Sequence, residues 1–323
     1  MTSTLVRQHV PHPPHPSSPS AAAPRSRARD WAEIQERMLV PLYEAVYERL
    51  EVGTGTRLLG LGCGSGLALL MAAARGAAVC GVDPDEERLE LARERLLARP
   101  GPRPGAHPGA PERAARLVRL GDGGLGDALK GTGAEAAGSG TGTGSGTGFT
   151  VVTAFEPLSA IGSGGGPSGP GDALSGRLAA AAALAEPGSP VVLAGWGPPE
   201  RCATSTVLRV GARLADPMFP QLPLGGAPSP ARWQPCGRDD LEHLAQRAGL
   251  RPDGSGRVAC PFGYADMDSA VRGLLSTGLF DAAERATDPT QVRKEIAEAL
   301  HPYRRADGTV WMENVLRYLI ARV

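Results

Sequence analysis

Glycines stand at alternate positions after a short apolar run, at Gly62, Gly64 and Gly66. A helical pattern follows them, and a second apolar run at 77–82 then ends in Asp83. Glycine lets the backbone bend sharply and lets a ligand approach main-chain N–H groups with no Cβ in the way. Asp83 stands 21 residues after Gly62, the offset at which a carboxylate that ends the second strand reaches ribose hydroxyls. The spacing therefore predicts half of a nucleotide-binding βαβ unit.

This glycine pattern differs from the dinucleotide-binding pattern G-x-G-x-x-G. Counted from Gly62 the third glycine would be Leu67, and counted from Gly60 it would be Ser65. Both registers fail, which makes a nicotinamide-dependent oxidoreductase the weaker hypothesis. A glycine-rich turn without a ligand is the structural alternative, since the chain holds 44 glycines.

Composition narrows the class of protein further. The chain has 34 basic and 34 acidic residues, and this zero net charge gives no electrostatic basis for binding nucleic acid. No run of 18 apolar residues and no secretory signal pattern occur, so the sequence predicts a cytoplasmic protein without membrane spans. Five scattered cysteines without C-x-x-C spacing fit reduced thiols. Histidines recur every third residue near the N-terminus, but without a carboxylate or fixed geometry we predict no metal site there.

Residues 1–29 form a Pro/Ser/His-rich stretch that we expect to be a disordered tail, and the domain is predicted over 30–323. Asp30 is a candidate N-cap, with Glu33 as its capping-box partner. An apolar helical stripe follows, with Pro41 as a break. This helix could lie over the cofactor pocket with Trp31 and Tyr43 as lid residues, although packing in the core is the alternative for both.

Strands and helices alternate along the rest of the chain, which predicts an α/β, doubly wound, mostly parallel seven-stranded sheet with helices on both faces. Gly/Ser/Thr-rich residues 131–148 are read as a flexible insertion, and 267–303 as a helical lid inserted before the last strand. Further strands are expected at 115–120, 149–155, 190–196, 258–262 and 309–322, and helices at 85–98, 174–185, 202–214 and 239–248.

From Asp30 to Val323 this order of elements resembles the class I S-adenosylmethionine (SAM) methyltransferases, and is most similar to the bacterial small-molecule branch that includes the ubiquinone/menaquinone-type enzymes. The segments that carry the resemblance are LLGLGCGSG at 58–66, CGVDP at 80–84, RLGDG at 119–123, FTVVTAFEPLSAI at 149–161, PGSPVVLAGWGPPE at 187–200 and VLRYLIARV at 315–323. The first two are specific and the others supportive. The resemblance implies transfer of a methyl group from SAM to a small-molecule acceptor, possibly in secondary metabolism.

The resemblance also implies a set of cofactor contacts. Backbone groups of Gly62, Cys63 and Gly64 would hold the methionyl part of SAM. Asp83 would bind the ribose hydroxyls, and Asp122 would lie near the adenine amino group. Phe155 and Glu156 would border the sulfonium.

One position departs from the family pattern. The family usually has Asp or Glu near the methionyl amino group where this chain has Gly60. Loss of a charge-assisted hydrogen bond there would weaken cofactor binding by about 1–3 kcal/mol, unless a nearby acid such as Glu156 takes its place. The departure keeps open an inactive methyltransferase-fold protein with a binding or regulatory role.

The acceptor side is less constrained by the sequence. Candidate general bases are His243, His301 and Glu156, but nothing in the sequence places them in a pocket, so no catalytic residue is assigned. The acceptor side could be lined by Phe262, Tyr264, Trp311 and Met312, with core packing as the alternative for each. The acceptor and the oligomeric state stay open.

Overall fold

The computed structural model describes residues 24–97, 115–121, 124–130, 148–155, 170–215 and 239–323. The predicted flexible insertion at 131–148 lies outside this part of the chain, apart from Gly148. Two predicted site residues, Asp122 and Glu156, also lie outside it.

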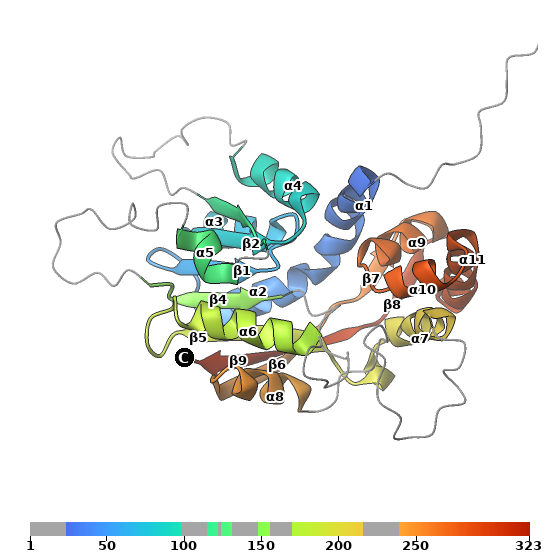
Figure 1. The fold of residues 1–323 in the computed structure, drawn as a ribbon. Helices are drawn as coiled ribbons and strands as arrows, with labels where there is room; N and C mark the ends of the chain where they lie inside the picture. Colours follow the sequence, from blue (N-terminus) through green and yellow to red (C-terminus); the bar gives the residue numbers. More distant parts are fainter. Residues whose placement is uncertain (1–23, 98–114, 122–123, 131–147, 156–169, 216–238) are drawn as a thin grey trace, which may run out of the picture.

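A seven-stranded sheet forms the centre of the molecule (Figure 1). Its spatial order is β3-β2-β1-β4-β5-β9-β6, and β9 runs antiparallel to both of its neighbours while the remaining pairs are parallel. The strands are β1 (Arg57–Leu61), β2 (Ala78–Asp83), β3 (Arg116–Arg119), β4 (Val151–Ala154), β5 (Pro190–Trp196), β6 (Arg251–Ala259) and β9 (Val315–Arg322). The predicted doubly wound, mostly parallel sheet is confirmed.

Helices cover both faces of the sheet because successive strand residues point to opposite sides. Leu58 belongs to a buried cluster shared with α2, α3 and α4, whereas Leu59 belongs to a second cluster shared with α5, α6 and α8. The helices are α2 (Val40–Arg49), α3 (Leu67–Ala74), α4 (Glu86–Leu97), α5 (Gly124–Lys130), α6 (Pro170–Ala182) and α8 (Asp240–Arg247).

A helical lobe lies at one end of the sheet, at the right of Figure 1. It consists of α7 (Thr204–Ala215), α9 (Met267–Ser276), α10 (Asp281–Ala286), α11 (Pro289–Leu300) and the 3-10 turn η5 (His301–Tyr303). A two-stranded sheet of β7 (Phe262–Tyr264) and β8 (Val310–Met312) flanks it. The helical structure predicted for 267–303 is therefore found, inserted between β7 and β8.

The N-terminal segment, defined here as residues 24–39, corrects the predicted start of the ordered domain. Helix α1 (Pro24–Asp30) begins before the expected boundary at residue 30, because Arg27 donates to the Leu275 carbonyl at 2.8 Å and pairs with Asp281, and Ala28 is buried. Asp30 is not an N-cap: its backbone is helical and its side chain makes no capping bond.

After α1 the helix changes its winding twice before it becomes regular. A π-helical turn, η1 (Trp31–Gln35), is followed by a 3-10 turn, η2 (Glu36–Leu39), and then by α2. Pro41 stands in the first turn of α2, where its missing N–H would have no helical partner anyway. The predicted break at Pro41 is confirmed.

The last strand is also corrected. The expected single strand at 309–322 is two strands, β8 and β9, separated by Glu313 and Asn314. Asn314 turns the chain between the two sheets: its side-chain carbonyl accepts from the Thr204 N–H at 3.1 Å, and its backbone carbonyl accepts from the Cys260 N–H at 2.8 Å. The sixth strand likewise divides into β6 and β7.

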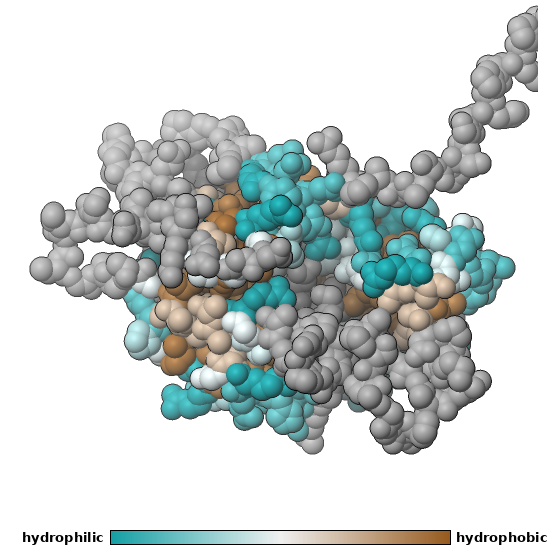
Figure 2. Space-filling model, viewed as in Figure 1, coloured by the Kyte–Doolittle hydropathy of each residue, from teal (hydrophilic) through white to brown (hydrophobic). Residues whose placement is uncertain are grey.

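Figure 2 shows the described surface on one side of the molecule. Hydrophilic residues cover α4 and much of the helical lobe, and hydrophobic residues gather near α6. Among the described residues, Val323 is the one large hydrophobic residue that is exposed, at 40%. No helix in the described ranges has the length and apolar character needed to cross a bilayer.

Candidate functional site

The glycine turn, residues 62–66, connects the end of β1 to the start of α3. Gly62, Gly64 and Gly66 have φ angles of 63°, 55° and 82°, values that side-chain-bearing residues rarely adopt. The Cys63 N–H donates to the Val82 carbonyl at 3.1 Å, which fixes the turn against β2. The turn therefore needs glycine for its conformation as well as for access to its backbone.

Asp83 ends β2 and holds the glycine turn directly. One oxygen of its carboxylate accepts from the Gly64 N–H at 2.8 Å, and the other accepts from the Asp85 N–H at 2.9 Å. The residue is only 1% exposed. The predicted acid and the predicted glycines thus come together. Contact of Asp83 with a ribose stays a prediction, and it needs the second lone pairs of these oxygens.

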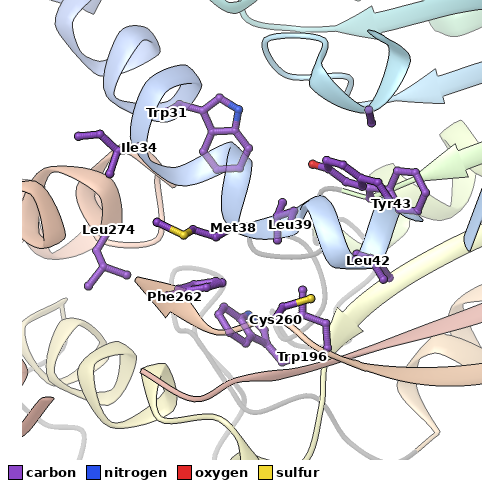
Figure 3. Packing of buried hydrophobic residues seen from close by; sticks show 14 of the residues in the cluster. Trp31, Ile34, Met38, Leu39, Leu42, Tyr43, Trp196, Cys260, Phe262 and Leu274 are labelled. Carbon is purple, nitrogen blue, oxygen red and sulfur yellow. The ribbon is translucent and has the colours of Figure 1, made fainter. Parts of the chain in front are cut away.

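The N-terminal segment lies over the turn (Figure 3). A Cβ added to Gly64 would lie 2.9 Å from the indole Nε1 of Trp31, so only glycine allows the indole to come this close. Arg88 of α4 stacks on the indole, with its guanidinium carbon 4.5 Å from the ring centroid. The Trp31 N–H is buried and has no hydrogen-bond partner in the described part of the chain. The segment therefore covers the turn, and Trp31 is only 3% exposed, in keeping with the core-packing alternative; its role as a lid over a cofactor stays a prediction.

Tyr43 and Phe155 lie on the other side of the turn. Their ring centroids are 5.0 Å apart, and Phe155 also contacts Tyr47 at 5.8 Å. All three residues are buried. Phe155 is therefore at the carboxyl end of β4 beside the turn, as predicted, and its contact with a sulfonium stays a prediction.

Glu36 is a site residue that the sequence analysis missed. It is 2% exposed, and its Oε2 accepts from the Ser65 hydroxyl and from the Arg95 guanidinium. Its Oε1 accepts from the Leu67 N–H at 3.3 Å, at the start of α3. Burial raises the pKa of this carboxyl above its ordinary value, opposed by its bonds to Ser65 and Arg95. Glu36 falls off the predicted apolar stripe, and it turns inward because the π and 3-10 turns change the phase of the helix.

The space enclosed between the segment and the turn is small. Its volume is about 20 Å³, which is room for about one water molecule, whereas ligand pockets hold about 300–1,000 Å³. It is lined by the N-terminal segment, α2, the ends of β1 and β4, the glycine turn and α3, through Trp31, Glu36, Leu39, Tyr43, Gly60, Leu61, Gly62, Cys63, Gly64, Ala68, Leu69, Thr153 and Phe155. These residue types suit a nucleotide-linked cofactor, but the segment must move to admit one.

Two of the candidate bases, His243 and His301, are not brought to this cavity, and the third, Glu156, lies outside the described residues. His243 on α8 and His301 in η5 are both exposed, and neither lines it. Of the acceptor-side candidates, Phe262, Tyr264 and Met312 are buried at 2% or less. Trp311 instead lies under Arg305 and donates to Glu313 at 2.6 Å.

No group of three or more metal-ligating side chains occurs among the described residues. The cysteines that the structure describes are free and buried. Burial raises the pKa of the Cys80 thiol to about 11 and that of Cys260 to about 12, so both stay protonated thiols near neutral pH.

The fold and the glycine turn define a doubly wound α/β protein with a glycine turn after its first strand. Comparison with protein families then gives a match to the methyltransferase domain over residues 59–102. This stretch holds the glycine turn, α3, β2 and α4. The match covers 44 of the 323 residues, and a methyltransferase domain over 30–323 stays a prediction.

Solved structures of similar shape include several methyltransferases. A putative methyltransferase from Bacillus halodurans is 14% identical, with 86% of this chain and 97% of that chain covered at a TM-score of 0.45. A SAM-dependent methyltransferase from Geobacter sulfurreducens, in complex with S-adenosyl-L-homocysteine, is 18% identical, with 93% and 99% covered at a TM-score of 0.45. A geranyl diphosphate methyltransferase in complex with SAM is 15% identical, with 94% and 93% covered at a TM-score of 0.43. Likenesses at this level carry no conclusion about the chemistry of this chain. Comparison with curated proteins found no match.

Proposed function

We propose that the protein transfers a methyl group from SAM to a small-molecule acceptor. The observation that carries the proposal is the Gly64 N–H bound to the Asp83 carboxylate at 2.8 Å, inside the stretch that matches the methyltransferase domain. This bond joins the glycine turn to an acid at the end of the second strand.

The cofactor supplies a methyl group already activated on a sulfonium, so the main task of the protein is positioning and exclusion of water. In the proposal the backbone of Gly62, Cys63 and Gly64 contacts the amino-acid part, and Asp83 holds the ribose. Asp122 and Glu156 keep their predicted places near the adenine and the sulfonium. Trp31 and Tyr43 close the site from above.

The acceptor side supports an apolar substrate. Trp196, Cys260, Phe262 and Leu274 lie together between the N-terminal segment and the helical lobe (Figure 3), and all are buried. Burial raises the pKa of the Tyr264 phenol, which stays protonated and donates to the Gln35 side-chain carbonyl at 2.9 Å.

Two buried donors in this region would suit an acceptor molecule that carries oxygen. The Gln35 amide nitrogen and the Trp196 indole nitrogen have no hydrogen-bond partner among the described residues. A buried donor without a partner costs about 1–3 kcal/mol, and an oxygen on the substrate would recover this cost. In the proposal α9 to α11 form the lid over this side.

The zero net charge of the chain supports a small molecule over nucleic acid as the acceptor. The free, buried cysteines support the cytoplasm as the compartment. The proposal involves no metal.

A second candidate function is a protein of methyltransferase fold that binds a ligand without catalysis. The small cavity and Gly60 favour it. Under this hypothesis the covered turn is the resting structure, and acceptor methylation is never observed.

Calorimetric binding of SAM and S-adenosylhomocysteine tests the proposal, with Asp83→Asn as the variant and the exposed Asp253→Asn as its control. We expect binding that Asp83→Asn weakens at least tenfold and Asp253→Asn leaves unchanged. Ligand at 100 times its dissociation constant should also raise the unfolding free energy by about 2.7 kcal/mol. An acceptor screen with labelled methyl then separates enzyme from binding protein. Absence of binding at millimolar ligand would overturn methyl transfer and leave the second candidate function.

A further inference from the structure

The N-terminal segment places a carboxylate at the cavity, whereas strand β1, which also lines the cavity, has none there. Among the described residues, Glu36 is the one charged residue that lines the cavity, and Gly60 lines the same cavity. Glu36 and Gly60 are 24 residues apart in the sequence, so this pairing is visible only in the fold.

The space beside Gly60 is filled in this chain. A Cβ added to Gly60 would lie 3.0 Å from Cδ2 of Leu69 in α3 and 3.7 Å from Cβ of Cys63. An acid at this position would have to displace the Leu69 side chain. The packing of α3 is therefore adapted to glycine at position 60, and a carboxylate must come from elsewhere.

The two oxygens of Glu36 have different surroundings. Oε2 accepts from both Ser65 and Arg95, whereas Oε1 accepts, among the described residues, only from the Leu67 N–H at the long distance of 3.3 Å. The same Oε1 lies 3.2 Å from the place that a Cβ on Gly64 would occupy. A carboxylate oxygen can accept about two hydrogen bonds, so Oε1 faces the glycine turn with capacity to spare.

We infer that Glu36 is the carboxylate that binds the amino group of the cofactor's amino-acid chain, in place of the acid missing at position 60. This inference rests on the proposed function and names a cofactor-binding residue for the same site. Arg95 and Ser65 hold one oxygen of the carboxylate, which leaves the other oriented toward the turn. Since Glu36 belongs to the covering segment, closure of the segment completes the cofactor site.

The test compares two ligands that differ in the group at issue. S-adenosylhomocysteine carries the amino-acid chain, and 5′-methylthioadenosine has a methyl group in its place. We expect Glu36→Gln to weaken binding of S-adenosylhomocysteine at least tenfold, which is about 1.4 kcal/mol, and to leave binding of 5′-methylthioadenosine within twofold of wild type. Glu33→Gln is the matched control, since Glu33 is an exposed acid in the same segment, and should change neither.

Each other result overturns the inference in a recognisable way. Equal loss of both ligands would assign Glu36 a structural role only, and circular dichroism with thermal melting would identify a variant that fails to fold. Tighter binding by Glu36→Gln would mean that the carboxylate blocks the turn. Unchanged binding of both ligands would refute the role of Glu36 while the proposed function stands, whereas wild type that binds neither ligand would refute the proposed function itself.

Discussion

At the residue scale, the buried charge of Glu36 links the site to pH. Burial raises its folded-state pKa above the ordinary value of 4.5, so between these two values the folded protein binds more protons than the unfolded chain. The contribution of this group to stability is then fully present below pH 4.5 and is lost as the pH rises through the raised pKa.

We therefore expect the unfolding free energy of wild type, minus that of Glu36→Gln, to fall as the pH increases from 4.5 and then to level off. Urea unfolding of both proteins between pH 4 and 8 measures this difference. A difference that increases with pH would mean that Arg95 and Ser65 outweigh the cost of burial.

Substitution of glycine by alanine should have opposite effects at two positions. Gly64 has a φ of 55°, and a Cβ there would meet the Trp31 indole, so Gly64→Ala should destabilise by about 1–3 kcal/mol. Gly176 lies in α6 with nothing within 4 Å of an added Cβ, so Gly176→Ala should stabilise by about 0.5–1 kcal/mol. Chemical denaturation measures both changes. Equal effects at the two positions would contradict the close approach of Trp31 to the turn.

At the element scale, ion pairs hold the N-terminal segment closed. Asp30 pairs with Arg272 of α9 at 2.8 Å, Arg27 pairs with Asp281 of α10, and the Ala32 carbonyl accepts from Arg95 at 2.7 Å. With about 20 Å³ of free space beneath it, the segment must open before a cofactor enters. The apparent association rate then depends on the fraction of open molecules.

Arg272→Gln removes one of these ties, and we expect it to raise the association rate of S-adenosylhomocysteine about two- to fivefold, because a partly exposed ion pair contributes up to about 1 kcal/mol. Stopped-flow tryptophan fluorescence measures the rate. Lys294→Gln is the control, since Lys294 pairs only within α11, with Glu298 at 3.9 Å. An unchanged rate in Arg272→Gln would show that this pair does not limit opening.

Elements that are determined by residues close together in the sequence lie where the sequence analysis predicts them. Strand β5 has the predicted bounds of 190–196, and α4 lies within the predicted helix at 85–98, with Asp85 accepting from the Glu87 N–H at 2.9 Å at its start. Apolar runs and capping residues suffice for such elements because neighbouring residues determine them.

Other elements depend on contacts with distant residues, and these the sequence could not supply. The π and 3-10 turns of the N-terminal segment exist where Arg95 and Ser65, on other elements, bind Glu36 and the Ala32 carbonyl. The break between β8 and β9 depends on Asn314 bonds to Thr204 and Cys260. The glycines and Asp83 were therefore predictable as a site, and Glu36 was not.

At the scale of the whole molecule, the sheet and the helical lobe share one hydrophobic cluster. It includes Val192 in β5, Tyr47 in α2, Phe280 before α10 and Ile296 in α11. Phe280 is fully buried, and its ring lies against α7 so closely that a Cβ on Gly211 would be 2.6 Å away. A lobe that shares its core with the sheet has no separate interior to keep it folded alone.

Phe280→Ala should therefore destabilise the whole chain and not the lobe alone. We expect a loss of about 3–5 kcal/mol, with far-UV circular dichroism and tryptophan fluorescence shifting together to the same lower midpoint. Leu279→Ala is the neighbouring control, because Leu279 is only partly buried and should cost less. If the two signals separated in Phe280→Ala, with helix lost before the tryptophan fluorescence changes, the lobe would be an independent unit. The lobe could then move away from the acceptor side while the sheet stays folded. If both signals instead change in a single transition, any opening of the site must come from the N-terminal segment.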